Sequence, residues 1–142
     1  MAINIRQDGD GSAGLVGVDG GTGEFVFVNI EYNASSVDKV SFVATRSYIA
    51  KSITGRPTVA GTDASAVTAV IKKAASGTAI TSGTALHSST YNLKGTADTV
   101  QALTMSTTAS DLSIPAGTAI GIDFTGTLTS ATGVVTVCLV PA

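Results

Sequence analysis

The stretch that decides the fold is Ile120-Gly121-Ile122-Asp123-Phe124, which follows the turn-like residues Ile114-Pro115-Ala116-Gly117. Its two isoleucines and Phe124 alternate with a glycine and an aspartate. Successive side chains of a β-strand point to opposite faces of a sheet. We therefore predict a strand here, with one face in a core and the other toward solvent.

Similar short runs recur along the chain, separated by Gly, Thr, Ser, Pro and Asp. The predicted strands are Glu24–Tyr32, Val40–Ala44, Tyr48–Ile53, Ala66–Lys72, Thr99–Met105, Leu112–Ile114, Ile120–Phe124 and Val134–Val140. A strand roughly every 8–12 residues, with turn signals between strands, is typical of a sandwich or a barrel. The pattern predicts an all-β fold, most simply a β-sandwich.

Three segments need a decision. Asp63–Lys73 contains alanines and begins with a helix-capping residue, which would suit a helix; its β-branched residues between 67 and 71 favour a strand, and we predict a strand. Gly55-Arg56-Pro57 is predicted to break the chain, because proline cannot donate to a strand ladder. Residues 78–91, rich in Thr, Ser and Gly, are expected to form a loop with short strands.

The composition indicates one folded domain with covered surfaces. Of the 142 residues, 44% are hydrophobic and only 13% are charged, which is the opposite of a disordered chain. A net charge of −2 does not suit a general polyanion binder, and we expect no direct nucleic-acid contact. So few charges suggest that other subunits or a partner cover part of the apolar surface.

Residues 1–23 differ from the rest and are predicted to form an arm or an added hairpin, followed by the sandwich at 24–142. Asp8-Gly9-Asp10-Gly11 and Gly20-Gly21-Thr22-Gly23 bracket a short apolar piece. The start of the chain lacks a basic region followed by an apolar stretch, so we expect no signal peptide. No run approaches the roughly 18 apolar residues of a membrane helix, so no membrane role is expected. With Cys138 as the only cysteine, no intrachain disulfide can form, which suits folding in a reducing cytoplasm.

Two motifs of this segment suggest ligands, and we assign neither. Gly9-Asp10-Gly11-Ser12-Ala13-Gly14 has the spacing of a dinucleotide loop, but the residues that follow are poor helix formers, so a flexible loop is the better interpretation. Asp8, Asp10, Ser12 and Asp19 approach calcium-loop spacing, yet Ala13 stands where that loop needs glycine. We predict no metal and no cofactor.

The chain contains few residues that could carry out catalysis. His87 is the only histidine and needs an acid and a nucleophile beside it, so a surface or half-buried loop histidine is expected. Cys138 lies in an apolar run and is expected to be a small buried residue. We predict no catalytic residues and no enzyme.

Two further surface features have ordinary explanations. Lys72 and Lys73, with Arg46 and Lys51, would make a poor nucleic-acid surface and are expected on solvated strand faces. Asn33-Ala34-Ser35 fits a glycan acceptor, but a chain with no export signal would not meet that machinery.

Four apolar residues are the candidates for an interface: Ile3, Ile5, Phe25 and Phe27. In the strand that starts near residue 24, the two phenylalanines share the face opposite Val26, Val28 and Ile30. A strand buried on both sides would explain this, and so would a contact with another subunit. Both interpretations stay open at this stage, since large exposed apolar patches usually mark contacts.

Several segments resemble capsid cement or decoration proteins of tailed bacteriophages. They are Thr58-Val59-Ala60-Gly61-Thr62-Asp63-Ala64-Ser65-Ala66-Val67-Thr68, then Ser89-Thr90-Tyr91-Asn92-Leu93-Lys94-Gly95-Thr96-Ala97-Asp98-Thr99-Val100, then Ile114-Pro115-Ala116-Gly117 leading to Phe124-Thr125-Gly126-Thr127-Leu128. The resemblance covers residues 39–141 and leaves the first 38 outside.

This resemblance implies a jelly-roll-like β-sandwich on the outer face of an assembled head, where it clamps neighbouring major capsid subunits. It implies a virion protein made in the host cytoplasm, with no catalytic residues. We also expect a homo-oligomer, a dimer or a trimer, because closed symmetric oligomers are the norm.

Two other functions remain as alternatives. A receptor- or carbohydrate-binding module of a phage fibre or tail would use the loops of the sandwich, although the chain has no Trp and only three Tyr to stack on sugar rings. A hydrolase is the other, and it lacks a credible triad.

Overall fold

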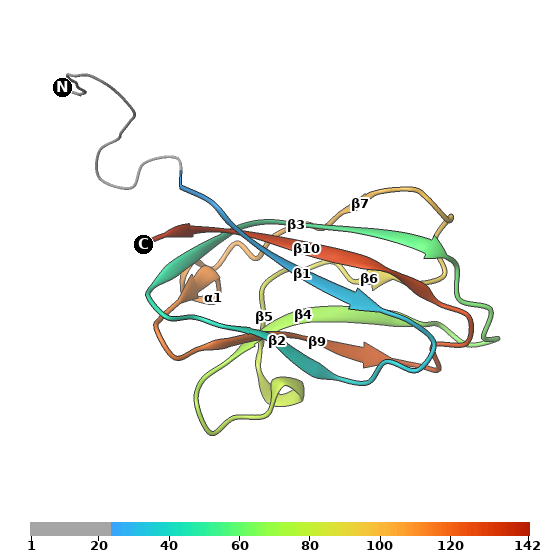
Figure 1. Cartoon of the computed structure of the whole chain (residues 1–142), viewed down its shortest axis with the longest axis horizontal. Coiled ribbons are helices and arrows are strands. Elements are labelled where there is room, and N and C mark those ends of the chain that lie inside the picture. The colour runs from blue at the N-terminus through green and yellow to red at the C-terminus, as the bar shows by residue number, and fades with distance from the viewer. Residues whose placement is uncertain (1–23) are drawn as a thin grey trace, which may run out of the picture.

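The computed structural model describes residues 24–142, which form two antiparallel sheets packed face to face (Figure 1). Sheet A has the order β1 (Val26–Tyr32), β10 (Thr132–Pro141), β3 (Tyr48–Val59), and β3 also pairs with the short strands β7 (Gln101–Ala102) and β8 (Ser113–Ile114). Sheet B has the order β2 (Lys39–Val43), β9 (Ala119–Thr125), β4 (Thr68–Ala74), and β4 also pairs with β5 (Thr84–Ala85) and β6 (Tyr91–Asn92). The predicted all-β sandwich is confirmed.

The chain alternates between the two sheets from β1 to β4 and again from β8 to β10. In sheet A, β10 lies between β1 and β3 and pairs with both. In sheet B, β9 lies between β2 and β4 and pairs with both. This order of strands, with four strand positions across each sheet, is that of a jelly roll. Two short helices, η2 (Ile80–Ser82) and α1 (Ala109–Leu112), lie in the connections. Neither helix among residues 24–142 has the length and apolar character needed to cross a membrane.

The strand prediction for the region after Asp63 is confirmed, because β4 occupies Thr68–Ala74. Its alternating residues Ala69 and Ile71 are fully buried between the sheets, while Thr68 and Val70 face outward and are half-buried. β-Branched residues pack well on such a pleated surface, and tertiary contacts on both sides outweigh the helix propensity of the alanines.

The predicted break at Gly55-Arg56-Pro57 is wrong, since β3 runs through all three residues. Pro57 lies opposite Gly133, beside a register shift in the pairing with β10, and its carbonyl points away from β10, so the missing proline N–H, on the same side as that carbonyl, removes no bond from the β10 ladder. The Pro57 carbonyl still accepts a 2.7 Å hydrogen bond from the backbone N–H of Asp98.

The predicted strand Thr99–Met105 is much shorter in the structure, where only Gln101 and Ala102 pair with β3. The Leu103 N–H still donates to the Ile53 carbonyl of β3 at 2.9 Å, and beyond Leu103 the chain finds other partners. The Thr104 carbonyl accepts the Ser88 N–H at 2.8 Å, and the Ser106 N–H donates to the Leu86 carbonyl at 3.0 Å. These bonds draw the segment away from sheet A toward residues 86–89.

Two buried tyrosines join the sheets near the end of β1. The hydroxyls of Tyr32 on β1 and Tyr91 on β6 share a 2.8 Å hydrogen bond, and the rings meet edge to face at 5.9 Å between centroids. Both are almost fully buried, and burial raises the pKa of each. Gly55 and Gly133 make room for them, because a Cβ at either glycine would overlap the Tyr91 ring or the Tyr32 hydroxyl.

Candidate interaction surface

The outward side of sheet A carries side chains in rows that run across three strands. One row joins Phe27 on β1, Cys138 on β10 and Ser52 on β3. The next rows along β1 are Asn29, Thr136 and Thr54, then Glu31, Val134 and Arg56. Apolar side chains therefore gather at the Phe27 end of this face and charged ones at the Glu31 end, with Lys51 exposed at the register shift beside Cys138.

The apolar end of this face is built around two phenylalanines. Phe25 and Phe27 are 53% and 62% exposed, and their rings stack with centroids 6.2 Å apart and planes inclined by 22°. The opposite side of the same strand holds Val28 and Ile30, which are buried. The sandwich thus uses the valine–isoleucine side of β1 for its core and leaves the phenylalanine side bare.

Three neighbours extend this apolar end. Val140 on β10 pairs with Ile49 on β3, and both are half-buried with side chains on the outward side; Cys138 lies beside Phe27. We call Phe25, Phe27, Ile49, Cys138 and Val140 the apolar patch. Exposed large apolar side chains that are contiguous, rather than scattered, mark contact sites in soluble proteins.

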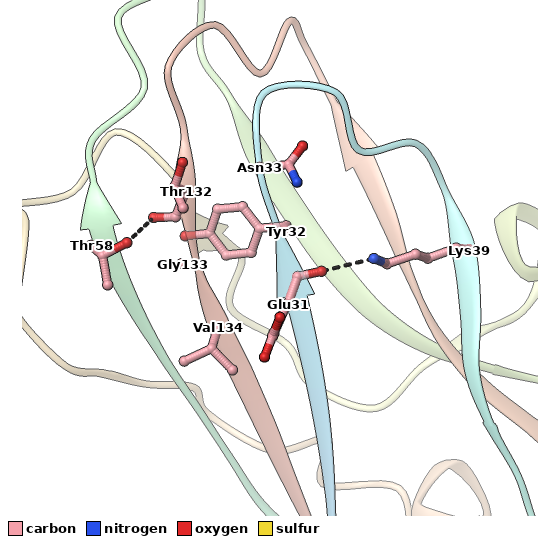
Figure 2. Close-up of a pocket in the computed structure, with 8 residues that line it drawn as sticks. All are labelled: Glu31, Tyr32, Asn33, Lys39, Thr58, Thr132, Gly133 and Val134. Carbon is pink, nitrogen blue, oxygen red and sulfur yellow. Dashed lines mark hydrogen bonds between the residues drawn. The ribbon is translucent and has the colours of Figure 1, made fainter.

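The charged end of the face borders a shallow depression where β1, β2, β3 and β10 approach one another (Figure 2). Lys39 reaches from β2 and donates a 2.8 Å hydrogen bond to the Glu31 carbonyl, and the Thr58 hydroxyl donates to the Thr132 carbonyl at 3.2 Å. The ring of Tyr32 beneath is buried and its hydroxyl is bonded to Tyr91. The depression therefore offers no exposed aromatic face on which a sugar ring would stack.

Of the four predicted interface residues, the structure places two. Phe25 and Phe27 lie side by side at the start of β1, whereas Ile3 and Ile5 lie outside the described residues. The dinucleotide-like and calcium-like motifs, together with the predicted arm at 1–23, also lie outside residues 24–142. Among residues 24–142, no group of three or more His, Cys, Asp or Glu side chains is arranged to hold a metal ion.

The expected burial of Cys138 is only partly right. Its side chain is half-buried and lies on the outward side of β10, since the neighbouring residues Val137 and Leu139 fill the core. Because successive side chains of a strand point to opposite faces, Cys138 points outward when Val137 and Leu139 point into the core. In an all-apolar run such as Val134–Val140, the sequence alone does not say which side is inside.

The expectation of a surface or half-buried His87 is wrong, because the ring is 5% exposed. Its Nε2 accepts a 2.8 Å hydrogen bond from the Ile71 N–H, so the proton must be on Nδ1, which donates to the Ser89 carbonyl. Burial lowers the pKa of His87, and the bond to Ser89 opposes that shift. Through these two hydrogen bonds the neutral ring connects β4 to the 86–89 segment.

The four basic residues singled out in the sequence do not form one patch. Lys72 pairs with Asp123 at 2.6 Å on sheet B, and Lys73 donates to the carbonyls of Ser110 and Ser113. Arg46 is 3.7 Å from Glu24, and Lys51 is exposed on β3. Asn33 forms a local turn in which its side chain accepts the Ser35 N–H at 2.8 Å.

Sequence inspection missed Ile49 and Val140 as members of the patch. Both lie in runs of apolar residues that were assigned as strands without a preferred face. Their signal is tertiary, because pairing with Phe27 and its neighbours is set by the register of β1, β10 and β3.

No protein-family model matches the sequence, and no curated protein does. Among solved structures, a chain in the capsid asymmetric unit of cyanophage Pam1 is similar in fold, with 15% sequence identity and a TM-score of 0.51. The match covers 99% of this chain and 100% of that one, so the sandwich of residues 24–142 is similar in fold to a chain of a phage capsid.

Proposed function

We propose that this chain is a structural protein of a tailed-phage head, which binds the outer surface of the assembled shell and cements neighbouring major capsid subunits. The observation that carries the proposal is an exposed apolar patch on a sandwich whose fold is similar to that of a phage capsid chain. The segments that resemble cement proteins point to the same role.

The proposed mechanism is mechanical. The apolar patch would lie across a seam between coat subunits, and separating them would re-expose the buried surface. Burial stabilises by roughly 25 cal/mol per Å² of apolar area. Each contact is modest, but a shell presents the same seam many times, so the summed effect on the particle is large.

The remaining predicted interface residues have a place in this proposal. Ile3 and Ile5 precede β1 in the chain and would extend the contact along the shell from the patch. The chain would then be part of the virion, made in the cytoplasm of the host, with the major capsid protein as its principal partner.

The experiment is to add the purified full-length chain to heads stripped of it. We expect binding at a copy number comparable to the coat protein and a higher temperature of head disruption. The double substitution Phe25→Ser and Phe27→Ser should abolish binding. Val37→Ser is the matched control, because Val37 is 70% exposed and apolar but lies in the β1–β2 connection, outside the patch.

Two outcomes would reject the proposal. One is that heads without the chain withstand heat and chelator as well as complete heads do. The other is that the double serine variant binds stripped heads as tightly as the unchanged chain.

A further inference from the structure

The four sheet edges within residues 24–142 are not equally protected. At one side of the sandwich, the two-residue strands β7 and β8 cover β3, and β5 and β6 cover β4. At the other side, β2 has a register irregularity between Val40 and Phe42 and begins with a lysine. Very short strands, bulges and edge lysines are the devices by which proteins prevent unwanted strand pairing.

Strand β1 has none of these devices. It is seven residues long, pairs with β10 without any register shift, and contains no proline, lysine or arginine. Its other edge has no strand partner among residues 24–142. An edge of this kind, whose only charged residue is Glu31 and which lies beside exposed phenylalanines, is a template for adding another strand.

The hydrogen bond from Lys39 to the Glu31 carbonyl shows which backbone groups of β1 point to the free edge. The Lys39 ammonium donates to the Glu31 carbonyl from the β2 side, as Figure 2 shows, so that carbonyl points away from β10. Backbone groups alternate in direction along a strand. Phe25, Phe27 and Asn29 therefore direct their N–H and C=O groups to the free edge, and Lys39 occupies the position after them.

We propose that two copies of this chain join through this edge, with β1 of each copy antiparallel about a two-fold axis perpendicular to sheet A. Opposite residues of an antiparallel pair share a face. With the axis at Val26, Phe25 lies opposite the partner's Phe27, and the four rings form one cluster on the outward side. Registers that reach Glu31 would have to displace Lys39, and with the axis at Val26 residues 24–28 of the two copies lie opposite one another.

The second copy fits this edge because the arrangement is self-complementary. Glu24 lies opposite the partner's Val28, so no like charges face each other, and the Glu31–Lys39 contacts of both copies stay outside the overlap. A two-fold contact of one surface with itself closes the oligomer at a dimer. The dimer also places both apolar patches on the same side, which would double the surface offered to the shell; that consequence rests on the proposed function, whereas the dimer does not.

Sedimentation equilibrium of the full-length chain without heads tests the proposal. We expect a reversible monomer–dimer equilibrium that Phe27→Lys weakens by at least about tenfold, because a lysine on the edge opposes pairing. Thr54→Lys is the matched control: Thr54 is exposed on the same face but on β3, away from the edge, and this variant should dimerise normally. A chain that stays monomeric, or closes as a trimer, overturns the proposal.

Amide exchange and oxidation show which surface pairs. The Phe25 and Phe27 amides should become protected only as the dimer forms. Protection in a monomer would mean that residues 1–23 fill the edge instead, and would overturn the proposal. Cys138 of the two copies would be separated by three strand spacings, about 14 Å, so oxidation should give no disulfide-linked dimer; a rapid disulfide would indicate face-to-face packing. Failure to bind heads would reject the proposed function and leave the dimer intact.

Discussion

The outward faces of the two sheets differ, although both sheets have the same number of strands and share one core. On sheet B, η2, within residues 75–86, packs on β9 and β4; Ile80 is buried over Gly121, and Lys72 donates to the Thr81 carbonyl at 2.6 Å. On sheet A, no described segment crosses the outward face at the phenylalanine end, and Phe25 and Phe27 remain exposed.

The two outward faces differ in the side chains against which a covering segment would pack. Sheet B has a glycine where the covering segment approaches most closely and an ion pair between Lys72 and Asp123 beside it. Sheet A has large side chains and no such gap. A covered face is completed within the chain, whereas a bare apolar face is completed by another molecule. This is why both proposals concern sheet A. The predictions below run from the largest expected effect on the free energy of unfolding to the smallest.

Filling the gap on the covered face should cost the most. In Gly121→Val, the new side chain would overlap the Lys39 carbonyl and Ile80, so either β2 or the covering segment must move. We expect a loss of about 3 kcal/mol, measured by urea unfolding. The matched substitution on sheet A, Thr54→Val, should change the free energy of unfolding by less than about 0.5 kcal/mol. Equal effects would mean that the two faces do not differ as described.

Removing the cover should cost somewhat less. Ile80→Ala deletes a buried side chain above Gly121, and we expect a loss of about 2 kcal/mol in the same measurement. Dimerisation should be unchanged, because β1 belongs to the other sheet. A variant as stable as the unchanged chain would show that residues 75–86 do not support sheet B.

Acid should weaken the attachment of β4 to the 86–89 segment. The pKa of His87 is lowered in the folded chain, so below about pH 6.5 the unfolded chain binds more protons. Stability should therefore fall as pH falls below about 6.5, by up to about 1.4 kcal/mol per pH unit from this group. In His87→Gln, whose side-chain oxygen can still accept the Ile71 N–H, this slope should disappear above the range where carboxylates titrate. An unchanged slope would assign it to other groups.

Changing the bare face should cost least. The double substitution Phe25→Ser and Phe27→Ser should alter the free energy of unfolding by less than about 0.5 kcal/mol, because both rings are largely exposed. Urea unfolding at a concentration where the chain is monomeric checks this. A loss of several kcal/mol would show that the phenylalanines belong to the fold of the monomer and not to a contact between molecules.

Much of the fold could be predicted from local sequence. Ile120–Phe124 and Val134–Val140 are strands because period-two alternation is a property of the extended backbone itself. The errors share one cause. Gly55 and Pro57 signal a turn locally, but Gly55 is a glycine because the Tyr91 ring lies against it, and Pro57 is tolerated because its backbone groups face Asp98 and not β10. Both reasons involve residues far along the chain.

Only part of the candidate site could be predicted from the sequence. Phe25 and Phe27 were identified on one face of a strand, but the opposite face was equally apolar, so core and interface could not be separated. Ile49, Cys138 and Val140 joined them only through the registers of β1, β10 and β3.

By itself, then, the sequence determined the strands and their alternation, because side-chain direction along an extended chain is fixed by covalent geometry. The tertiary structure alone decided which side of each strand is covered, which edge stays open and where Tyr32 meets Tyr91. Those outcomes depend on contacts between segments distant in sequence, whose free energies no single stretch of residues contains.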